Sequence, residues 1–121
     1  MATALCPNIL VSDIARSIKF YEGVGYKEVH RVNGPTGGAV WAALEREGHR
    51  IFLEVAPPGR KLGATVQFYL AVDDLTGEAQ RLRSGSIEYL GPEAKPYGMT
   101  EIAFHDPDGY DWIAGQHTQR S

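Results

Sequence analysis

The alternation of apolar and polar positions along the chain describes one series of elements twice. In the first half an apolar run predicts a strand, and Asp13 follows it as the cap of a helix that ends at Gly23. The strands expected in this half cover residues 3–11, 26–32, 40–44 and 50–56. The predicted order is therefore strand, helix, strand, strand, strand.

The same order begins again after the Pro- and Gly-rich stretch 57–63, where Asp74 caps a second helix. The strands expected here cover residues 65–72, 87–90, 99–104 and 110–114. Asp13 and Asp74 lie 61 residues apart, and so do the turn glycines Gly48 and Gly109. We therefore predict an α+β fold of two tandem β-α-β-β-β modules, at about 1–57 and 64–121, whose curved mixed sheets line a cleft.

The two faces of the predicted strands differ in character. One face is almost wholly apolar, as expected where helices cover a sheet. Its members are Ile9, Val11, Ile51, Leu53, Val55, Phe68, Leu70, Val72, Trp112 and Ala114. The opposite face mixes aromatic, amide and charged side chains, which is typical of a binding cleft. Its members are Cys6, Asn8, Leu10, Arg50, Phe52, Glu54, Gln67, Tyr69, Ala71, Asp111, Ile113 and Gly115.

Length and composition indicate one globular domain. The chain has 121 residues, of which 43% are hydrophobic and 22% charged, enough for a core without metal or disulfide staples. The formal charge of −3 shows no excess of basic residues of the kind that binds nucleic acid, and no apolar run is long enough to cross a bilayer. Cys6 is the single cysteine, which fits a reducing compartment. We expect a cytoplasmic protein that binds neither nucleic acid nor membranes.

Several short motifs resemble the vicinal oxygen chelate superfamily of glyoxalases, bleomycin resistance proteins and extradiol dioxygenases. Their order and spacing extend over nearly the whole chain. The motifs are Pro7-x-Ile9-x-Val11-x-Asp13, Ser17-Ile18-x-Phe20-Tyr21, Gly25-Tyr26, Val72-Asp73-Asp74-Leu75 and Phe104-x-Asp106-Pro107-Asp108-Gly109-Tyr110. The resemblance implies a single glyoxalase/bleomycin-resistance-like domain over residues 1–121, and a homodimer.

The resemblance also indicates where a metal would be bound. Metal-dependent members take one ligand from the first strand and one from the last strand of each module, which in this chain implies Cys6, Phe52, Gln67 and Ile113. Only Gln67 is a ligand type that these enzymes commonly use, because the side chains of phenylalanine and isoleucine have no donor atoms. We therefore expect no metal and no other cofactor.

Two rearrangements would restore part of a metal site. A bulge in the strand that carries Phe52 would bring Glu54 toward the Phe52 position, and Cys6 could act as a soft ligand. Ile113 would still be unable to donate. A metal-dependent lyase, isomerase or dioxygenase with such a rearranged site is the alternative function, and acid/base catalysis by Glu54 without metal is a third.

The candidate ligand-binding residues are the polar and aromatic groups of the mixed face and its loops. They are Asn8, Trp41, Phe52, Glu54, Gln67, Tyr69, Tyr97 and Ile113. Glu54 is a candidate general base or cation-binding group, or else a rim carboxylate facing Arg50. The amides of Asn8 and Gln67 either orient a ligand or bond across strands. Trp41, Tyr69 and Tyr97 offer aromatic surface for a planar ligand, or else belong to the core and its lid.

From these residues we expect a metal-free protein that binds or sequesters a small, partly aromatic molecule. No catalytic residue is assigned, and Glu54 is the one candidate.

Overall fold

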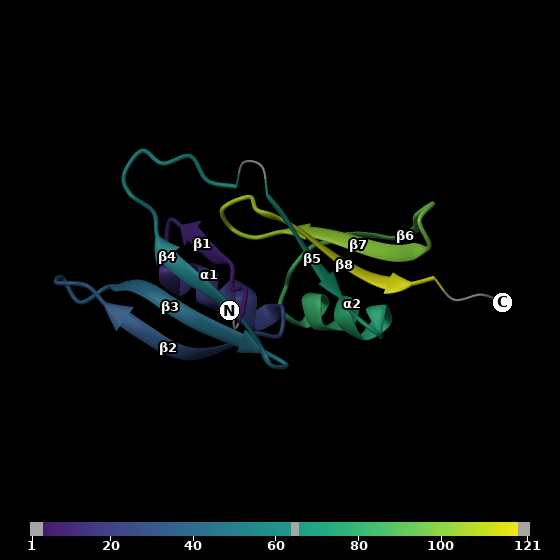
Figure 1. Cartoon of the computed structure of the whole chain (residues 1–121), viewed down its shortest axis with the longest axis horizontal. Helices are drawn as coiled ribbons and strands as arrows, with labels where there is room; N and C mark the ends of the chain where they lie inside the picture. Colours follow the sequence, from purple (N-terminus) through teal and green to yellow (C-terminus); the bar gives the residue numbers. More distant parts are fainter. Residues whose placement is uncertain (1–3, 64–65, 119–121) are drawn as a thin grey trace. The chain divides into compact units, whose positions relative to one another are not determined.

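The computed structural model describes residues 4–63 and 66–118. The chain divides between Leu62 and Gly63 into two compact units. Both have the predicted order of one helix and four strands (Figure 1). This confirms the α+β fold with a duplicated β-α-β-β-β module. No helix in the described part of the chain is long and apolar enough to span a membrane.

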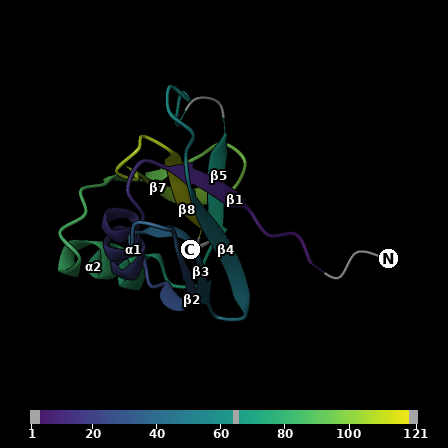
Figure 2. The same ribbon diagram turned by 90° about the vertical axis from the view of Figure 1, so that its left-hand side faces the viewer.

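The first unit is a four-stranded mixed sheet with one helix on one face. Its elements are β1 (Asn8–Val11), α1 (Ile14–Gly23), β2 (Lys27–Asn33), β3 (Ala39–Arg46) and β4 (His49–Val55). The strand order is β1-β4-β3-β2, with β1 parallel to β4 and the other pairs antiparallel. Figure 2 shows α1 beside the strands of this sheet. The core between them is fully buried at Val11, Tyr21 and Leu53.

The second unit repeats this plan. Its elements are β5 (Gln67–Ala71), α2 (Leu75–Ser84), β6 (Leu90–Ala94), β7 (Met99–His105) and β8 (Asp111–His117). The strand order is β5-β8-β7-β6, with β5 parallel to β8. Helix α2 contacts β7 and β8, and the side chains of Leu82, Ile102 and Trp112 are almost completely buried.

Both helices begin and end through the same local chemistry. The carboxylate of Asp13 accepts a hydrogen bond from the Arg16 N–H at 3.1 Å, and that of Asp74 accepts one from the Gly77 N–H at 3.1 Å. The two predicted N-caps are therefore confirmed.

At the C-terminal end of each helix, a backbone N–H reaches back five residues. Tyr26 donates to the Tyr21 carbonyl at 2.9 Å, and Ile87 donates to the Leu82 carbonyl at 2.8 Å. The residue before each donor has positive φ, 96° at Gly25 and 59° at Ser86. This is the Schellman arrangement, in which an apolar residue after the left-handed position folds back on the helix.

This cap explains why the prediction of a strand over residues 87–90 was wrong. Ile87 is 9% exposed and closes the end of α2, so its apolar character serves the helix, and pairing with β7 begins at Leu90. The first predicted strand also began too early, since β1 starts at Asn8, directly after Pro7. Residues 1–3 and 64–65, where two predicted strands began, lie outside the described part of the chain.

The predicted division between the two faces of the strands holds in most positions. Ile9, Val11, Ile51, Leu53, Trp112 and Ala114 are at most 2% exposed. Four residues expected on the covered face are less buried: Val55, at the end of its strand, is 37% exposed, and Phe68, Leu70 and Val72 are half-buried. We call the sheet face opposite each helix the open face.

Candidate functional site

The open face of the first unit carries an aromatic pair beside a hydrogen-bonded polar pair. The rings of Trp41 and Phe52 lie 5.0 Å apart between centroids, and His30 lies 5.9 Å from Trp41. The Asn8 amide donates to the Glu54 carboxylate at 3.0 Å. Register places Trp41 opposite Glu54 and Asn8 opposite Phe52, so the four predicted residues of this unit are brought together on one face.

These contacts bear on the proposed role of Glu54. The predicted cross-strand alternative for Asn8 is present, because its amide bonds to Glu54. Arg50, which was the expected partner of Glu54, instead forms an ion pair with Glu45 at 3.9 Å. Glu54 and Asn8 are both exposed, so a ligand can reach them.

The open face of the second unit is organised around a buried carboxylate. Glu101 in β7 is 5% exposed, and its Oε2 accepts hydrogen bonds from the Tyr69 hydroxyl at 2.9 Å and the Tyr97 hydroxyl at 2.7 Å. Tyr69 comes from β5 and Tyr97 from the turn before β7. Both rings are open to solvent, with 48% of Tyr69 and 65% of Tyr97 exposed. We call Tyr69, Glu101 and Tyr97 the tyrosine–glutamate cluster.

The cluster depends on a missing side chain at Gly115. In β8, between β5 and β7, a Cβ on Gly115 would lie only 2.6 Å from the Cζ of Tyr69, so the Tyr69 ring passes directly over this glycine. Any larger residue would force the ring aside. Glycine at this position thus allows a residue of β5 to reach a residue of β7 across the intervening strand.

The surroundings of the two phenols oppose their ionisation. Desolvation raises the pKa of Tyr69 to about 12, and its hydrogen bond to Glu101 and the negative charge of that carboxylate contribute in the same direction. The pKa of Tyr97 is also raised, first by its hydrogen bond to Glu101 and then by desolvation. Both hydroxyls are therefore proton donors at neutral pH.

The other two predicted residues of this unit lie on the same sheet. Ile113 is half-buried in β8, opposite Tyr69 on one side and Ala103 on the other. Gln67 is exposed at the start of β5, opposite Asp111, and its side-chain amide forms no hydrogen bond with the described residues. Ile113 therefore adjoins the cluster, whereas Gln67 lies two positions before Tyr69.

Glu101 and Gly115 have roles that sequence reasoning missed, although a signal was present. Ile102 and Phe104 are apolar and buried, so alternation places Glu101 and Ala103 on the open face, as it does for Ile113. The alternation in β7 is therefore enough to predict a carboxylate on this face. Its two phenol partners depend on tertiary structure.

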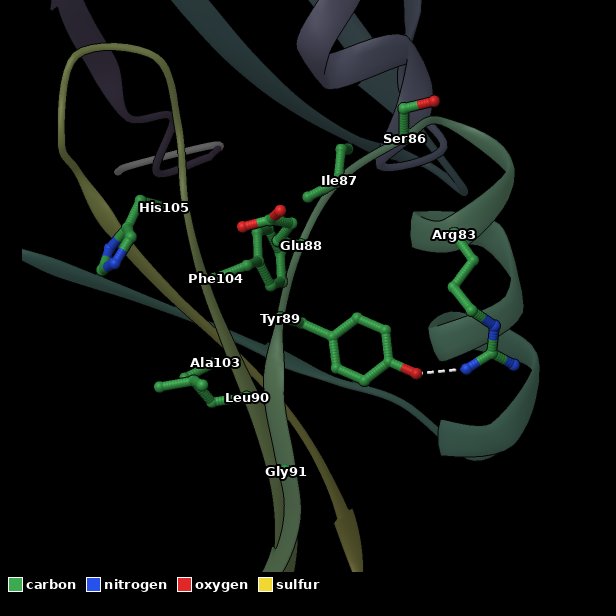
Figure 3. Close-up of a pocket in the computed structure, with 10 residues that line it drawn as sticks. All are labelled: Arg83, Ser86, Ile87, Glu88, Tyr89, Leu90, Gly91, Ala103, Phe104 and His105. Atoms are coloured by element: carbon green, nitrogen blue, oxygen red, sulfur yellow. Dashed lines mark hydrogen bonds between the residues drawn. The ribbon is translucent and has the colours of Figure 1, made fainter.

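A separate groove lies in the second unit, near the start of the edge strand β6. It has a volume of about 1020 Å³ and extends from the C-terminal end of α2 along residues 86–91 to β7 (Figure 3). Within it the Arg83 guanidinium donates to the Tyr89 hydroxyl, as the dashed line shows. None of the eight predicted ligand residues lines this groove. We therefore do not assign the candidate site to this groove, in spite of its size.

The donor atoms at the positions implied for a metal do not fit a metal site. Phe52 and Ile113 offer none, and Glu54 is hydrogen-bonded to Asn8. The Cys6 thiol donates to the Arg50 carbonyl at 3.2 Å, and burial raises the pKa of this thiol, which disfavours the thiolate that binds metals. Within residues 4–63 and 66–118, no three His, Cys, Asp or Glu side chains gather where they could hold an ion.

Comparison with known proteins places this fold and these residues in a family. The sequence profile described as the Glyoxalase/Bleomycin resistance protein/Dioxygenase superfamily matches residues 4–113. The chain belongs to this superfamily. Uncharacterized protein Mb0911c of Mycobacterium bovis, a relative, is 31% identical over 93% of this chain and 82% of its own length.

Two solved structures have the same fold. TnmS3, an antibiotic binding protein from Streptomyces sp. CB03234, superposes with a TM-score of 0.79 at 24% identity, over 98% of each chain. The bleomycin resistance determinant encoded on transposon Tn5 gives a TM-score of 0.79 at 25% identity, over 98% of this chain and all of the other. The superfamily description covers both resistance proteins and enzymes, so the function has to be argued from this member's own side chains.

Proposed function

We propose that this superfamily member binds and sequesters a small, partly aromatic organic molecule without a metal ion, using the open faces of its sheets. One observation carries the proposal. At two of the four positions implied for metal ligands, the chain has the hydrocarbon side chains of Phe52 and Ile113, and each adjoins exposed or half-buried aromatic surface.

The chemistry of the open faces supports a ligand with an aromatic part. Trp41 and Phe52 offer two rings whose centroids are 5.0 Å apart, with the polar groups of Asn8 and Glu54 on the same face. Tyr69 and Tyr97 offer two more rings. Apolar surface with a few placed polar groups is the usual composition of small-molecule sites.

The resemblance of the fold to an antibiotic binding protein and a resistance determinant is consistent with sequestration. A sequestering protein needs affinity alone, so it has no need of a nucleophile, a general base or a Lewis acid. We include the predicted homodimer in this proposal, as in the family that the motifs resemble.

A thermal-shift screen in the presence of a chelator tests the proposal, because a ligand that binds only the native state raises its melting temperature. Bleomycin and a panel of aromatic metabolites would be added with EDTA, and Mn²⁺, Ni²⁺ and Zn²⁺ in separate wells without it. We expect organic compounds to raise the melting temperature in EDTA. Stabilisation by a divalent ion, together with turnover that EDTA abolishes, would favour the metal-dependent enzyme.

Tryptophan fluorescence then locates the ligand. Trp112 is 2% exposed in the core, whereas Trp41 is half-buried on the open face of the first unit. A ligand on that face should therefore change the emission of the wild type and leave a Trp41→Phe variant almost unchanged. A response that persists in the variant would place the ligand elsewhere.

A further inference from the structure

The tyrosine–glutamate cluster holds a buried carboxylate without a counter-ion. Glu101 is 5% exposed, and no Lys, Arg or His among the described residues lies within ion-pair distance of it. Burying a carboxylate is costly unless a cation or several hydrogen bonds compensate for the lost water. Two phenol hydrogen bonds compensate in part, and both go to the same oxygen, Oε2.

The second carboxylate oxygen is left available. Oε1 accepts no hydrogen bond from the described part of the chain, as the two bonds of Glu101 both involve Oε2. Among the described residues, only the Ser17 hydroxyl is both sealed from solvent and unpartnered, so Oε1 keeps a path to the surface. A ligand atom can therefore reach Oε1 from solvent.

The charge around the cluster also favours a cation. Glu93 in β6 lies directly opposite Glu101, and like charges in such a cross-strand pair repel. Lys95 neutralises Glu93 through an ion pair at 3.3 Å. No cation among the described residues offsets the charge of Glu101, which lies beside a surface formed by Ile113 and Ala103 that carries no charge.

Aromatic rings around an anion are a recognised way to bind organic cations. A ring face attracts ammonium and guanidinium groups through its quadrupole, and a carboxylate adds a direct charge interaction. Tyr69 and Tyr97 hold their hydroxyls on Glu101 and expose about half or more of their surface. We propose that this cluster is a subsite for an organic cation, and that the sequestered molecule carries an ammonium or guanidinium group.

This inference rests on the proposed binding function, which it makes more specific. The probes are choline and neohexanol, the neutral analogue in which carbon replaces the ammonium nitrogen. Two-dimensional NMR titrations of the full chain would follow residues of β7, β8 and the turn at Tyr97. Choline should shift these resonances and bind about ten- to a hundredfold more tightly than neohexanol, the ratio expected for a charged contact.

Variants with matched charge changes assign the effect to Glu101. Glu101→Gln keeps hydrogen-bonding atoms but removes the charge, and should weaken choline binding about ten- to a hundredfold. Glu93→Gln makes the same change on the neighbouring strand, at a side chain that is 70% exposed and already paired, and should weaken it less than about threefold. Spectra of each variant without ligand establish that it is folded.

The outcomes separate this inference from the proposed function. Equal binding of choline and neohexanol at the cluster, or undiminished binding of choline by Glu101→Gln, would overturn the cation subsite while leaving small-molecule binding intact. The absence of choline binding would also overturn the subsite. The proposed function itself would be overturned by a thermal-shift screen in which no organic compound stabilises the chain, or by the metal-dependent turnover described above.

Discussion

The phenol ring of Tyr69 lies directly over Gly115, and this close approach lets its hydroxyl donate to Glu101 on the far side of β8. The Tyr69 side chain of β5 thus crosses β8 at Gly115 and bonds the Glu101 carboxylate of β7, which links the three strands. The arrangement gives the second unit a polar group that is buried yet reachable from the open face.

Replacing Gly115 with alanine should displace the Tyr69 ring and break its hydrogen bond to Glu101. We expect the free energy of unfolding to fall by about 1.5–3 kcal/mol, the value of a hydrogen bond to a charged group. The pKa of Tyr69 should also fall from about 12 toward its ordinary value, as measured by NMR titration of the ring. Gly38→Ala is the control, because nothing lies near a Cβ built there and its φ is not positive. An unchanged Tyr69 pKa in Gly115→Ala would contradict the geometry.

Stability at alkaline pH should depend on Tyr69. Its pKa is raised to about 12 in the folded chain, whereas an unfolded tyrosine ionises near 10. The unfolded state therefore loses its proton first, so the contribution of Tyr69 is complete below about pH 10 and is lost as the pH rises to about 12. The free energy of unfolding, measured in urea, should therefore fall more steeply over this pH range for the wild type than for Tyr69→Phe. Parallel pH dependences of the two proteins would refute this contribution.

Ser86→Gly should stabilise the protein. Ser86 has φ of 59° at the end of α2, where the repeat-equivalent position at the end of α1 is Gly25. A side chain in this left-handed region costs about 1–2 kcal/mol, and the greater freedom of glycine in the unfolded chain offsets part of the gain. We expect the free energy of unfolding, measured in urea, to increase by a net value of about 0.5–1 kcal/mol. Gly25→Ser should change the stability in the opposite direction, and a loss of stability in both variants would show that the two caps are not equivalent.

The two capping aspartates should contribute alike. Asp13→Ala and Asp74→Ala each remove the acceptor for a backbone N–H at the start of a helix, and each should lower the free energy of unfolding by about 1 kcal/mol. Asp73→Ala removes the same charge next to the cap, from a side chain that does not bond the helix, and should change stability by less than about 0.5 kcal/mol. Equal effects of Asp73→Ala and Asp74→Ala would assign the effect to charge.

Features set by local chemistry could be predicted from the sequence. The aspartate caps, the turns at Gly48 and Gly109 and the alternation of Ile9 with Val11 depend on neighbouring residues only. The repeat then supported the order of elements in the second half. Ile87 was misassigned because an apolar residue can serve a helix cap as well as a strand, and only the backbone bond to Leu82 distinguishes the two.

The candidate site was predictable as a list of residues, but not as a set of contacts. The positions of Asn8, Trp41, Phe52 and Glu54 on one face follow from strand alternation, but the Asn8–Glu54 bond depends on the pairing of β1 with β4. Glu101 was overlooked because its importance comes from two phenol hydroxyls that the fold brings to it, that of Tyr69 from β5 and that of Tyr97 from the turn before β7. Strand alternation gives its place on the open face, but its burial and its phenol partners depend on tertiary contacts that a sequence does not state.

The central claim is that the chain binds an organic ligand without a metal. Equilibrium dialysis of chelator-treated protein against Mn²⁺, Ni²⁺ and Zn²⁺, with bound metal measured by mass spectrometry, tests the metal-free part most directly. We predict far less than one tightly bound ion per chain, and the same low value in Gln67→Ala and Glu54→Gln. About one ion per chain in the wild type, lost in those two variants, would contradict the account and establish a rearranged metal site.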